Sequence, residues 1–238
     1  MSQKTLPSCG AVIVGGGSGT RFGGDKLSIS VAGKPLIAWT LLAFEQTPAI
    51  SSIVLVIPEG REDEFRRIAH EACITKLTAL IAGGSQRHES VLRGLHALSD
   101  GIALAAIHDA ARPLITPALI NRCLNVAAKE GASSLAAPVT DTLHETDPAG
   151  CAARTIDRSS LHAMQTPQVF RAAAIRDLLD NLDKDSGKPT DEVSVALAAG
   201  WRIPFVVNLE PNPKVTWPHD LAVVEALLSA REGNGASK

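Results

Sequence analysis

The chain has 238 residues, of which 45% are hydrophobic and 20% are charged, and its formal net charge is −2. A chain of this length can bury a sizeable core, and its charge balance gives no reason to expect a polyanionic partner. Only 3% of the residues are aromatic and tyrosine is absent, so stacking platforms for single-stranded nucleic acid are scarce and no nucleic-acid partner is expected.

Apolar strands alternate with helical patterns through the first half of the chain. Strands are predicted at residues 11–14, 52–57, 77–82 and 102–107, and helices at residues 35–46, 61–72, 89–98 and 117–129. Continuous apolar strands separated by helices indicate a parallel sheet that is covered on both faces. The predicted class is therefore α/β, with a doubly wound, mainly parallel, Rossmann-like sheet.

A polar segment, residues 140–162, interrupts this alternation. Within it, residues 142–144 and 154–156 fit two short strands joined by a turn at residues 147–150. A hairpin of this length without its own core needs a surface to pack on, and a second subunit is the natural candidate. We therefore expect a protruding β-arm that serves dimerisation.

The α/β pattern resumes after the arm. Helices are predicted at residues 172–182, 191–199 and 218–230, and a strand at residues 203–207. We find no internal repeat and no linker, so the prediction is one domain over residues 1–238 that carries the arm as an insertion.

The cysteines and the first apolar run indicate in which cellular compartment the protein is expected. The four cysteines form no CxxC pair, which favours reduced thiols and gives no zinc site. The run at residues 11–14 is too short for a signal peptide or a membrane span. We expect a cytoplasmic protein with no membrane partner.

A glycine-rich stretch, GGGSGTRFGGDK, runs from Gly15 to Lys26 directly after the first predicted strand. Glycines let backbone N–H groups approach phosphate oxygens, and Arg21 and Lys26 add positive charge. It is not a Walker loop, because no GK[ST] follows, and the acidic residue of a dinucleotide fingerprint is missing. A plain strand-to-helix turn would need fewer glycines. Phosphate binding is therefore predicted for Gly15, Gly16, Gly17 and Gly19.

Polar residues also follow the third and fourth predicted strands, at the sheet edge where doubly wound proteins bind ligands. In GGSQRHES, Ser90 and the helix N-terminus can bind a base or a phosphate, or Ser85 can be an ordinary helix cap. In HDAARP, Asp109 can coordinate Mg²⁺ on a triphosphate. Arg112 either holds Asp109 in a structural ion pair or binds substrate.

Lys214 follows the last predicted strand, in NPKVT. There it either pairs with a phosphate or is an exposed lysine. Asp191 fits an ordinary helix start on propensity alone.

Taken in order, eight motifs resemble one family, the 2-C-methyl-D-erythritol 4-phosphate cytidylyltransferases of the non-mevalonate isoprenoid pathway. They read GGGSGTRFGGDK, GGSQRHESV, HDAARP, APVTDT, TIDR, QTPQVF, TDE and NPKVTWPHDL. Each motif is weak alone, but the match keeps register over nearly the whole chain. The resemblance implies that CTP and a sugar-alcohol phosphate react, with Mg²⁺, to give the CDP-alcohol and pyrophosphate.

The resemblance also implies roles for the nucleotide side of the site. Arg21, Lys26 and Lys214 would hold the phosphates and neutralise charge at the α-phosphorus. The cytosine and ribose would be recognised by Gly83, Gly84 and Ser90. Asp109 would lie beside the ribose and the metal ion.

For the acceptor, the resemblance implies Thr142 and Arg158 of the arm together with Thr166 and Thr190. In the family the arm reaches the site of the partner subunit, so a homodimer is implied. This agrees with the hairpin expected from the residues alone.

The chemistry suits these residue types. The attacking phosphate is already anionic, so the barrier lies in bringing two anions together, and positioned cations and a metal ion lower it. We therefore expect a site rich in Arg and Lys, with His108 in a structural role.

The glycine stretch departs from the family where Asp25 precedes Lys26, in place of the usual proline. Asp25 either serves the metal ion or faces solvent. The alternative functions are a cytidylyltransferase for another polyol phosphate, such as ribitol 5-phosphate, and a non-catalytic nucleotide-binding homologue.

Overall fold

The computed structural model describes residues 6–16, 22–182 and 189–235. Its centre is a seven-stranded sheet in the order β11-β7-β10-β6-β1-β4-β5. The strands are β1 (Cys9–Val14), β4 (Ile50–Ile57), β5 (Leu77–Ala82), β6 (Leu104–Asp109), β7 (Ala132–Pro138), β10 (His162–Arg171) and β11 (Phe205–Val207). The predicted α/β class with a mainly parallel sheet is confirmed.

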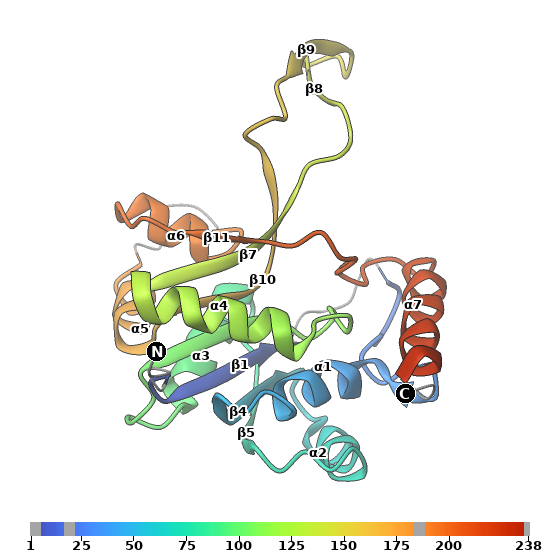
Figure 1. Cartoon of the computed structure of the whole chain (residues 1–238), viewed down its shortest axis with the longest axis vertical. Coiled ribbons are helices and arrows are strands. Elements are labelled where there is room, and N and C mark those ends of the chain that lie inside the picture. The colour runs from blue at the N-terminus through green and yellow to red at the C-terminus, as the bar shows by residue number, and fades with distance from the viewer. Residues whose placement is uncertain (1–5, 17–21, 183–188, 236–238) are drawn as a thin grey trace.

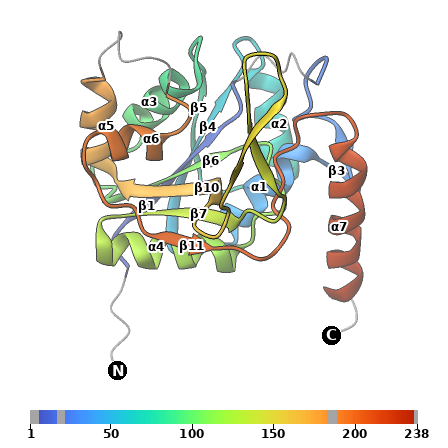
Figure 2. The ribbon, with the colours of Figure 1, turned by 90° about the horizontal axis from the view of Figure 1, so that it is seen from above.

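Helices cover both faces of the sheet (Figure 1; Figure 2). One face packs on α1 (Leu36–Glu45), α2 (Glu62–Glu71) and α4 (Pro117–Glu130), and α7 (Asp220–Gly235) joins the same core. The other face packs on α3 (Arg87–Ala97), α5 (Ala172–Asp180) and α6 (Glu192–Ala198).

Successive side chains of the buried strands pack alternately into the two hydrophobic cores, one on each face of the sheet. In β4, for example, Ile53 and Leu55 belong to the first core, whereas Val54 and Val56 belong to the second. Side chains on successive strand residues point to opposite faces, so a strand buried on both faces is apolar throughout. Of the helices described, none has the length and hydrophobicity to cross a membrane.

Strand β10 was not predicted. It runs antiparallel between β6 and β7 near the centre of the sheet. Its sequence, HAMQTPQVFR, contains Pro167 and several polar residues, a pattern that argues against a central strand. The structure accommodates them with a register irregularity between Met164 and Gln168. Strand β7 and a small hairpin, β2 (Ser30–Val31) and β3 (Lys34–Pro35), were also not predicted.

The arm is a hairpin of β8 (Leu143–Thr146) and β9 (Ala152–Ile156), and it extends away from the body of the molecule (Figure 1). Its turn is fixed by Asp147, whose Oδ1 accepts hydrogen bonds from the backbone N–H groups of Ala149 (3.0 Å) and Cys151 (2.8 Å). Nearly all its residues are exposed. A segment with so little contact to its own chain is suited to pack on another surface.

Gly94 lets α3 pack closely on β1 and β4. A Cβ there would overlap the Val12 side chain and lie 3.1 Å from Val56 Cγ2. We expect Gly94→Val to lower the free energy of unfolding by about 1–3 kcal/mol, the usual cost of overpacking a core, as measured by urea unfolding. Gly101→Val is the matched control, because no described atom lies within 4 Å of its Cβ position. Equal stabilities of the two variants would contradict the prediction.

Candidate functional site

Two cavities meet at the carboxyl end of the central strands. The first, of about 690 Å³, is lined by the glycine-rich stretch, the segment after β4 and the start of α3. The second, of about 440 Å³, is lined by β10, α6 and the residues before α6. Arg87, Asp109 and Lys214 line both cavities. The site therefore has two compartments with one shared, charged wall.

The first cavity has a floor of closely packed backbone. A Cβ on Gly16 would lie 3.1 Å from the Cα of Gly83, so the loops after β1 and β5 approach closely where a side chain would crowd them. Ser90, which is buried, accepts a hydrogen bond from the Gly84 N–H at 3.0 Å and donates to the Gln86 carbonyl at 3.1 Å. Four predicted residues, Gly16, Gly83, Gly84 and Ser90, thus lie together.

The N-terminus of α3 is capped by Gln86 and not by Ser85. Glu89 Oε2 accepts from the backbone N–H groups of Ser85 (2.8 Å) and Gln86 (3.2 Å). The interpretation of Ser85 as the helix cap was therefore wrong.

The far end of the glycine-rich stretch is fixed by Asp25. Asp25 forms an ion pair with Arg61 (Oδ2 to Nη1, 2.7 Å) and accepts from the backbone N–H groups of Leu27 (3.0 Å) and Ser28 (3.2 Å). Lys26 lies between these anchors and lines the first cavity. The Asp25 carboxylate therefore has partners within the protein, although the residue is exposed, and its contact with a metal ion stays a prediction. The predicted Gly17, Gly19 and Arg21 lie outside the described residues.

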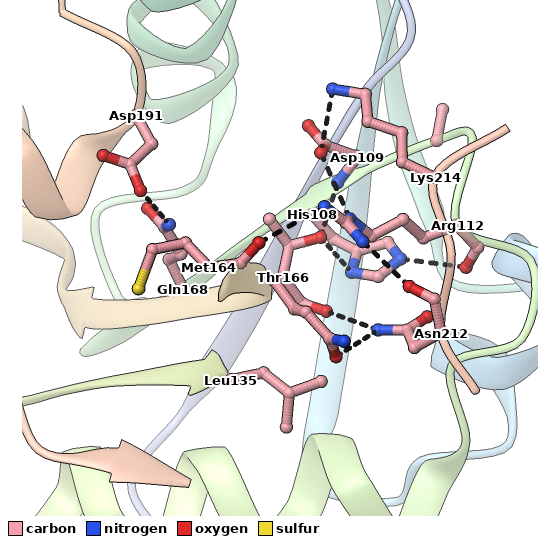
Figure 3. Close-up of polar contacts among 12 residues, drawn as sticks. His108, Asp109, Arg112, Leu135, Met164, Thr166, Gln168, Asp191, Asn212 and Lys214 are labelled. Atoms are coloured by element: carbon pink, nitrogen blue, oxygen red, sulfur yellow. Dashed lines mark hydrogen bonds and ion pairs between the residues drawn. The ribbon is translucent and has the colours of Figure 1, made fainter. Parts of the chain in front are cut away.

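Asp109 ends β6 and is the centre of the shared wall (Figure 3). Three cations surround its carboxylate: Arg87 Nε at 3.1 Å, Lys214 Nζ at 3.0 Å and Arg112 Nε at 3.4 Å. Burial alone would raise the pKa of Asp109, but these positive charges outweigh it and hold the pKa well below its usual value. Asp109 is therefore ionised and fixed.

Arg112 forms the structural ion pair that the sequence left open. Its other two nitrogens donate to backbone carbonyls, Nη1 to Asn212 at 2.8 Å and Nη2 to Met164 at 3.5 Å (Figure 3). It also lines the second cavity, and its contact with substrate stays a prediction.

His108 and Thr166 lie behind Asp109. The Thr166 hydroxyl is 2.9 Å from His108 Nδ1 and accepts from the Asp109 N–H at 3.1 Å (Figure 3). Burial lowers the pKa of His108 to about 3, so the ring is neutral near pH 7. Its Nε2 lies 3.3 Å from the Arg112 carbonyl, so Nε2 carries the proton and Nδ1 accepts from Thr166. This arrangement fits the structural role expected of His108.

The second cavity contains two of the four residues predicted for the acceptor, Thr166 and Thr190. The other two, Thr142 and Arg158, lie on the arm and line neither cavity of their own chain. In this chain Arg158 donates to the Thr140 carbonyl. An arm that carries these residues away from its own site is consistent with delivery to another subunit (Figure 1).

The sequence reasoning missed Arg87 and Glu192. Arg87 Nη1 donates to both carboxylate oxygens of Glu192, at 2.7 and 2.9 Å, and Glu192 is only 1% exposed. Burial raises the pKa of Glu192, and the charge of Arg87 opposes that rise. Arg87 belongs to the motif GGSQRHES and Glu192 to the motif TDE. Because the two residues are 105 positions apart, the sequence carries no local signal that they form a pair.

The donor set for a metal ion is small. In residues 6–16, 22–182 and 189–235, no three His, Cys, Asp or Glu side chains are grouped to hold a metal ion. Asp109 is the carboxylate common to both cavities. One carboxylate suits a Mg²⁺ ion that arrives on a triphosphate, because Mg²⁺ takes most ligands from phosphates and water at such sites.

The chain is similar to proteins of known family. The family model of 2-C-methyl-D-erythritol 4-phosphate cytidylyltransferase matches residues 9–230. A protein of that name from Parasynechococcus marenigrum is 40% identical over 223 residues, 93% of this chain and 98% of the relative. One from Pelotomaculum thermopropionicum is 36% identical over 226 residues, 94% of this chain and 95% of the relative.

Solved structures are similar as well. The crystal structure of 4-diphosphocytidyl-2C-methyl-D-erythritol synthase from Anaerococcus prevotii matches with a TM-score of 0.83 at 25% identity, covering 94% of this chain and 96% of that one. The crystal structure of 2-C-methyl-D-erythritol 4-phosphate cytidylyltransferase from Thermus thermophilus matches with a TM-score of 0.74 at 28% identity, covering 94% and 98%.

Proposed function

This chain belongs to the 2-C-methyl-D-erythritol 4-phosphate cytidylyltransferase family, and on that premise we propose how its site carries out the reaction. It is a nucleotidyltransferase that converts CTP and 2-C-methyl-D-erythritol 4-phosphate to the CDP-alcohol and pyrophosphate, in isoprenoid biosynthesis. One observation carries the assignment of the site: two cavities share a wall of cations around Asp109.

The first cavity takes CTP. Backbone at Gly15 and Gly16 lies along the phosphates. Gly84 and Ser90, which line the cavity, face the cytosine and ribose together with the adjacent Gly83. Lys26 and Lys214 both line this cavity and contact the triphosphate in this proposal. Arg21 adds a third cation from the same glycine-rich stretch.

The second cavity takes the phosphate of the acceptor, beside Thr166 and Thr190. An oxygen of that phosphate attacks the α-phosphorus of CTP, one P–O bond forms, and the bond to the β-phosphate bridge breaks to release pyrophosphate. The nucleophile is already an anion, so no proton must be removed. The protein contributes position and positive charge, which stabilise the crowded phosphoryl group.

A divalent cation, Mg²⁺, belongs to this proposal. Asp109 is the residue that would contact it, and when bound the ion neutralises triphosphate charge. Lys214 contacts the same carboxylate, with its Nζ 3.0 Å from Asp109 Oδ2.

Turnover with a panel of acceptors tests the function. Purified protein is incubated with CTP and Mg²⁺, and pyrophosphate release is followed with methylerythritol phosphate or ribitol 5-phosphate. Release with methylerythritol phosphate supports the assignment. Release with ribitol 5-phosphate alone would show a different acceptor, and CTP binding without release from any acceptor would show a non-catalytic homologue.

The protein acts as a cytoplasmic homodimer in this proposal, and the arm of each subunit completes the site of the other. The support is the exposed arm, which carries Thr142 and Arg158 away from their own cavities. Subunit mixing tests it with Arg158→Ala and Lys214→Ala, assayed at a methylerythritol phosphate concentration well below the wild-type KM. Mixed dimers should regain activity, because one site then has an intact Lys214 and an intact neighbouring arm. Activity no higher than the average of the two variants would mean that the arm serves its own site or none.

Arg158→Ala should raise the KM for methylerythritol phosphate about tenfold and leave the KM for CTP nearly unchanged, because one charged contact to the acceptor phosphate is lost. Steady-state kinetics with each substrate varied in turn measures this. Arg154→Ala is the matched control, since Arg154 lies on the same arm and pairs with Glu145 at 2.6 Å. Equal effects on both KM values would contradict the assignment of Arg158 to the acceptor.

A further inference from the structure

Arg87 has a spare donor at the junction of the two cavities. Its Nε donates to Asp109 and its Nη1 to both oxygens of Glu192. For Nη2, no acceptor occurs among the residues that the structure describes. The Arg87 side chain is 25% exposed and lines both cavities. A guanidinium nitrogen there is available to a ligand.

Arg112, the other arginine on Asp109, differs in this respect. All three of its side-chain nitrogens donate to protein oxygens, namely Asp109, Asn212 and Met164. Its side chain is also less exposed, at 13%. Arg112 therefore fixes the wall, whereas Arg87 both fixes the wall and keeps hydrogen-bonding capacity toward the cavities.

Glu192 explains why Arg87 stays in place. A buried carboxylate that loses its partner is costly, so Arg87 cannot swing away to follow a ligand. Nη1 donates to both oxygens of Glu192 and Nε donates to Asp109, so the two carboxylates together orient the guanidinium plane. A charge held in advance in this way stabilises a transition state better than a mobile one.

We propose that Arg87 contacts substrate, with Nη2 donating to phosphate oxygens where the acceptor phosphate meets the α-phosphate of CTP, and that Glu192 is the residue that positions it. This inference rests on the proposed function, because it assigns the two cavities to the two phosphates. It adds a catalytic cation that the motif reading of the sequence did not assign.

The test separates a direct contact from simple neutralisation of Glu192. The double variant Arg87→Met, Glu192→Gln removes both charges of the buried pair, a change that such sites often tolerate. The single variant Glu192→Gln keeps Arg87. We expect kcat of the double variant to fall about 10- to 100-fold below that of Glu192→Gln, the scale of a charged hydrogen bond. If the double variant turns over within threefold of the single variant, Arg87 only neutralises Glu192 and the proposal fails.

A second comparison tests whether Arg87 acts only by holding Asp109 in place. In an Asp109→Asn background, adding the double change should still lower kcat about tenfold, because the lost contact is to substrate. No further loss would mean that Arg87 works only by holding Asp109. The matched control is His96→Met, Asp180→Asn, which removes another side-chain contact of α3, between His96 Nε2 and Asp180 Oδ1, outside both cavities. Thermal unfolding of every variant checks that each is folded.

A measurement of CTP binding without any acceptor allows this inference to fail or succeed independently of the proposed function. The affinity for CTP, measured by calorimetry on wild type, on Glu192→Gln and on the double variant, does not depend on which acceptor is used. A wild type that is inactive with methylerythritol phosphate would overturn the proposed function. A double variant that loses CTP affinity relative to Glu192→Gln would support Arg87 even then, and unchanged affinity together with unchanged kcat would overturn Arg87 alone.

Discussion

Lys214→Ala should lower kcat by about 100-fold or more, the cost of one lost charge contact in the transition state. Lys214 Nζ lies 3.0 Å from Asp109 Oδ2 and the residue lines both cavities. It can therefore reach the phosphoryl group that passes from one compartment to the other. The effect should fall on kcat more than on the KM for CTP, because charge on the transferring group develops during the reaction.

The folded structure should survive this change. Asp109 keeps Arg87 and Arg112 as partners when Lys214 is removed. Pyrophosphate release under saturating substrates measures kcat, and thermal unfolding confirms the fold. Lys129→Ala, an exposed lysine near the end of α4, serves as the control for loss of one positive charge. Unchanged turnover of Lys214→Ala would remove this residue from the mechanism.

Lys26→Ala should also lower kcat by about 100-fold, since it removes a second phosphate cation. Lys26 lines the first cavity, and its two neighbours in the sequence are both anchored to the protein. Leu27 is buried in the core, and Asp25 is tied to Arg61 at 2.7 Å. The backbone at Lys26 is therefore anchored on both sides and keeps the lysine beside the cavity before the nucleotide arrives.

Asp25→Asn provides the matched comparison. The Asp25–Arg61 pair is partly exposed, with side chains 28% and 26% accessible, and such pairs contribute only about 0–1 kcal/mol. Asp25→Asn should therefore reduce kcat less than about tenfold, although it changes a neighbour of Lys26. A loss as large as that of Lys26→Ala, restored by raising the Mg²⁺ concentration, would instead make Asp25 a metal ligand.

Much of the fold was predictable because its strands are buried on both faces. The strand at residues 77–82 was predicted with the bounds that the structure gives to β5, and the helix at residues 117–129 differs from α4 by one residue. The arm was predictable for the opposite reason, since its polar residues and turn signals interrupt the apolar pattern. Strand β10 was missed because Pro167 and its polar neighbours mask a strand whose pairing comes from β6 and β7.

The sequence by itself determined the α/β class and the family, and it predicted the glycine-rich stretch as a binding segment at the sheet edge where the two cavities lie. These features depend on residue type and on short spacings, which the chain displays directly. Only the tertiary structure decided which charges meet. Arg87 and Glu192 lie 105 residues apart, and Lys214 and Asp109 are equally remote in the chain. They come together because the ends of β6, α3 and α6 converge at one edge, and burial there forces each charge to find a partner.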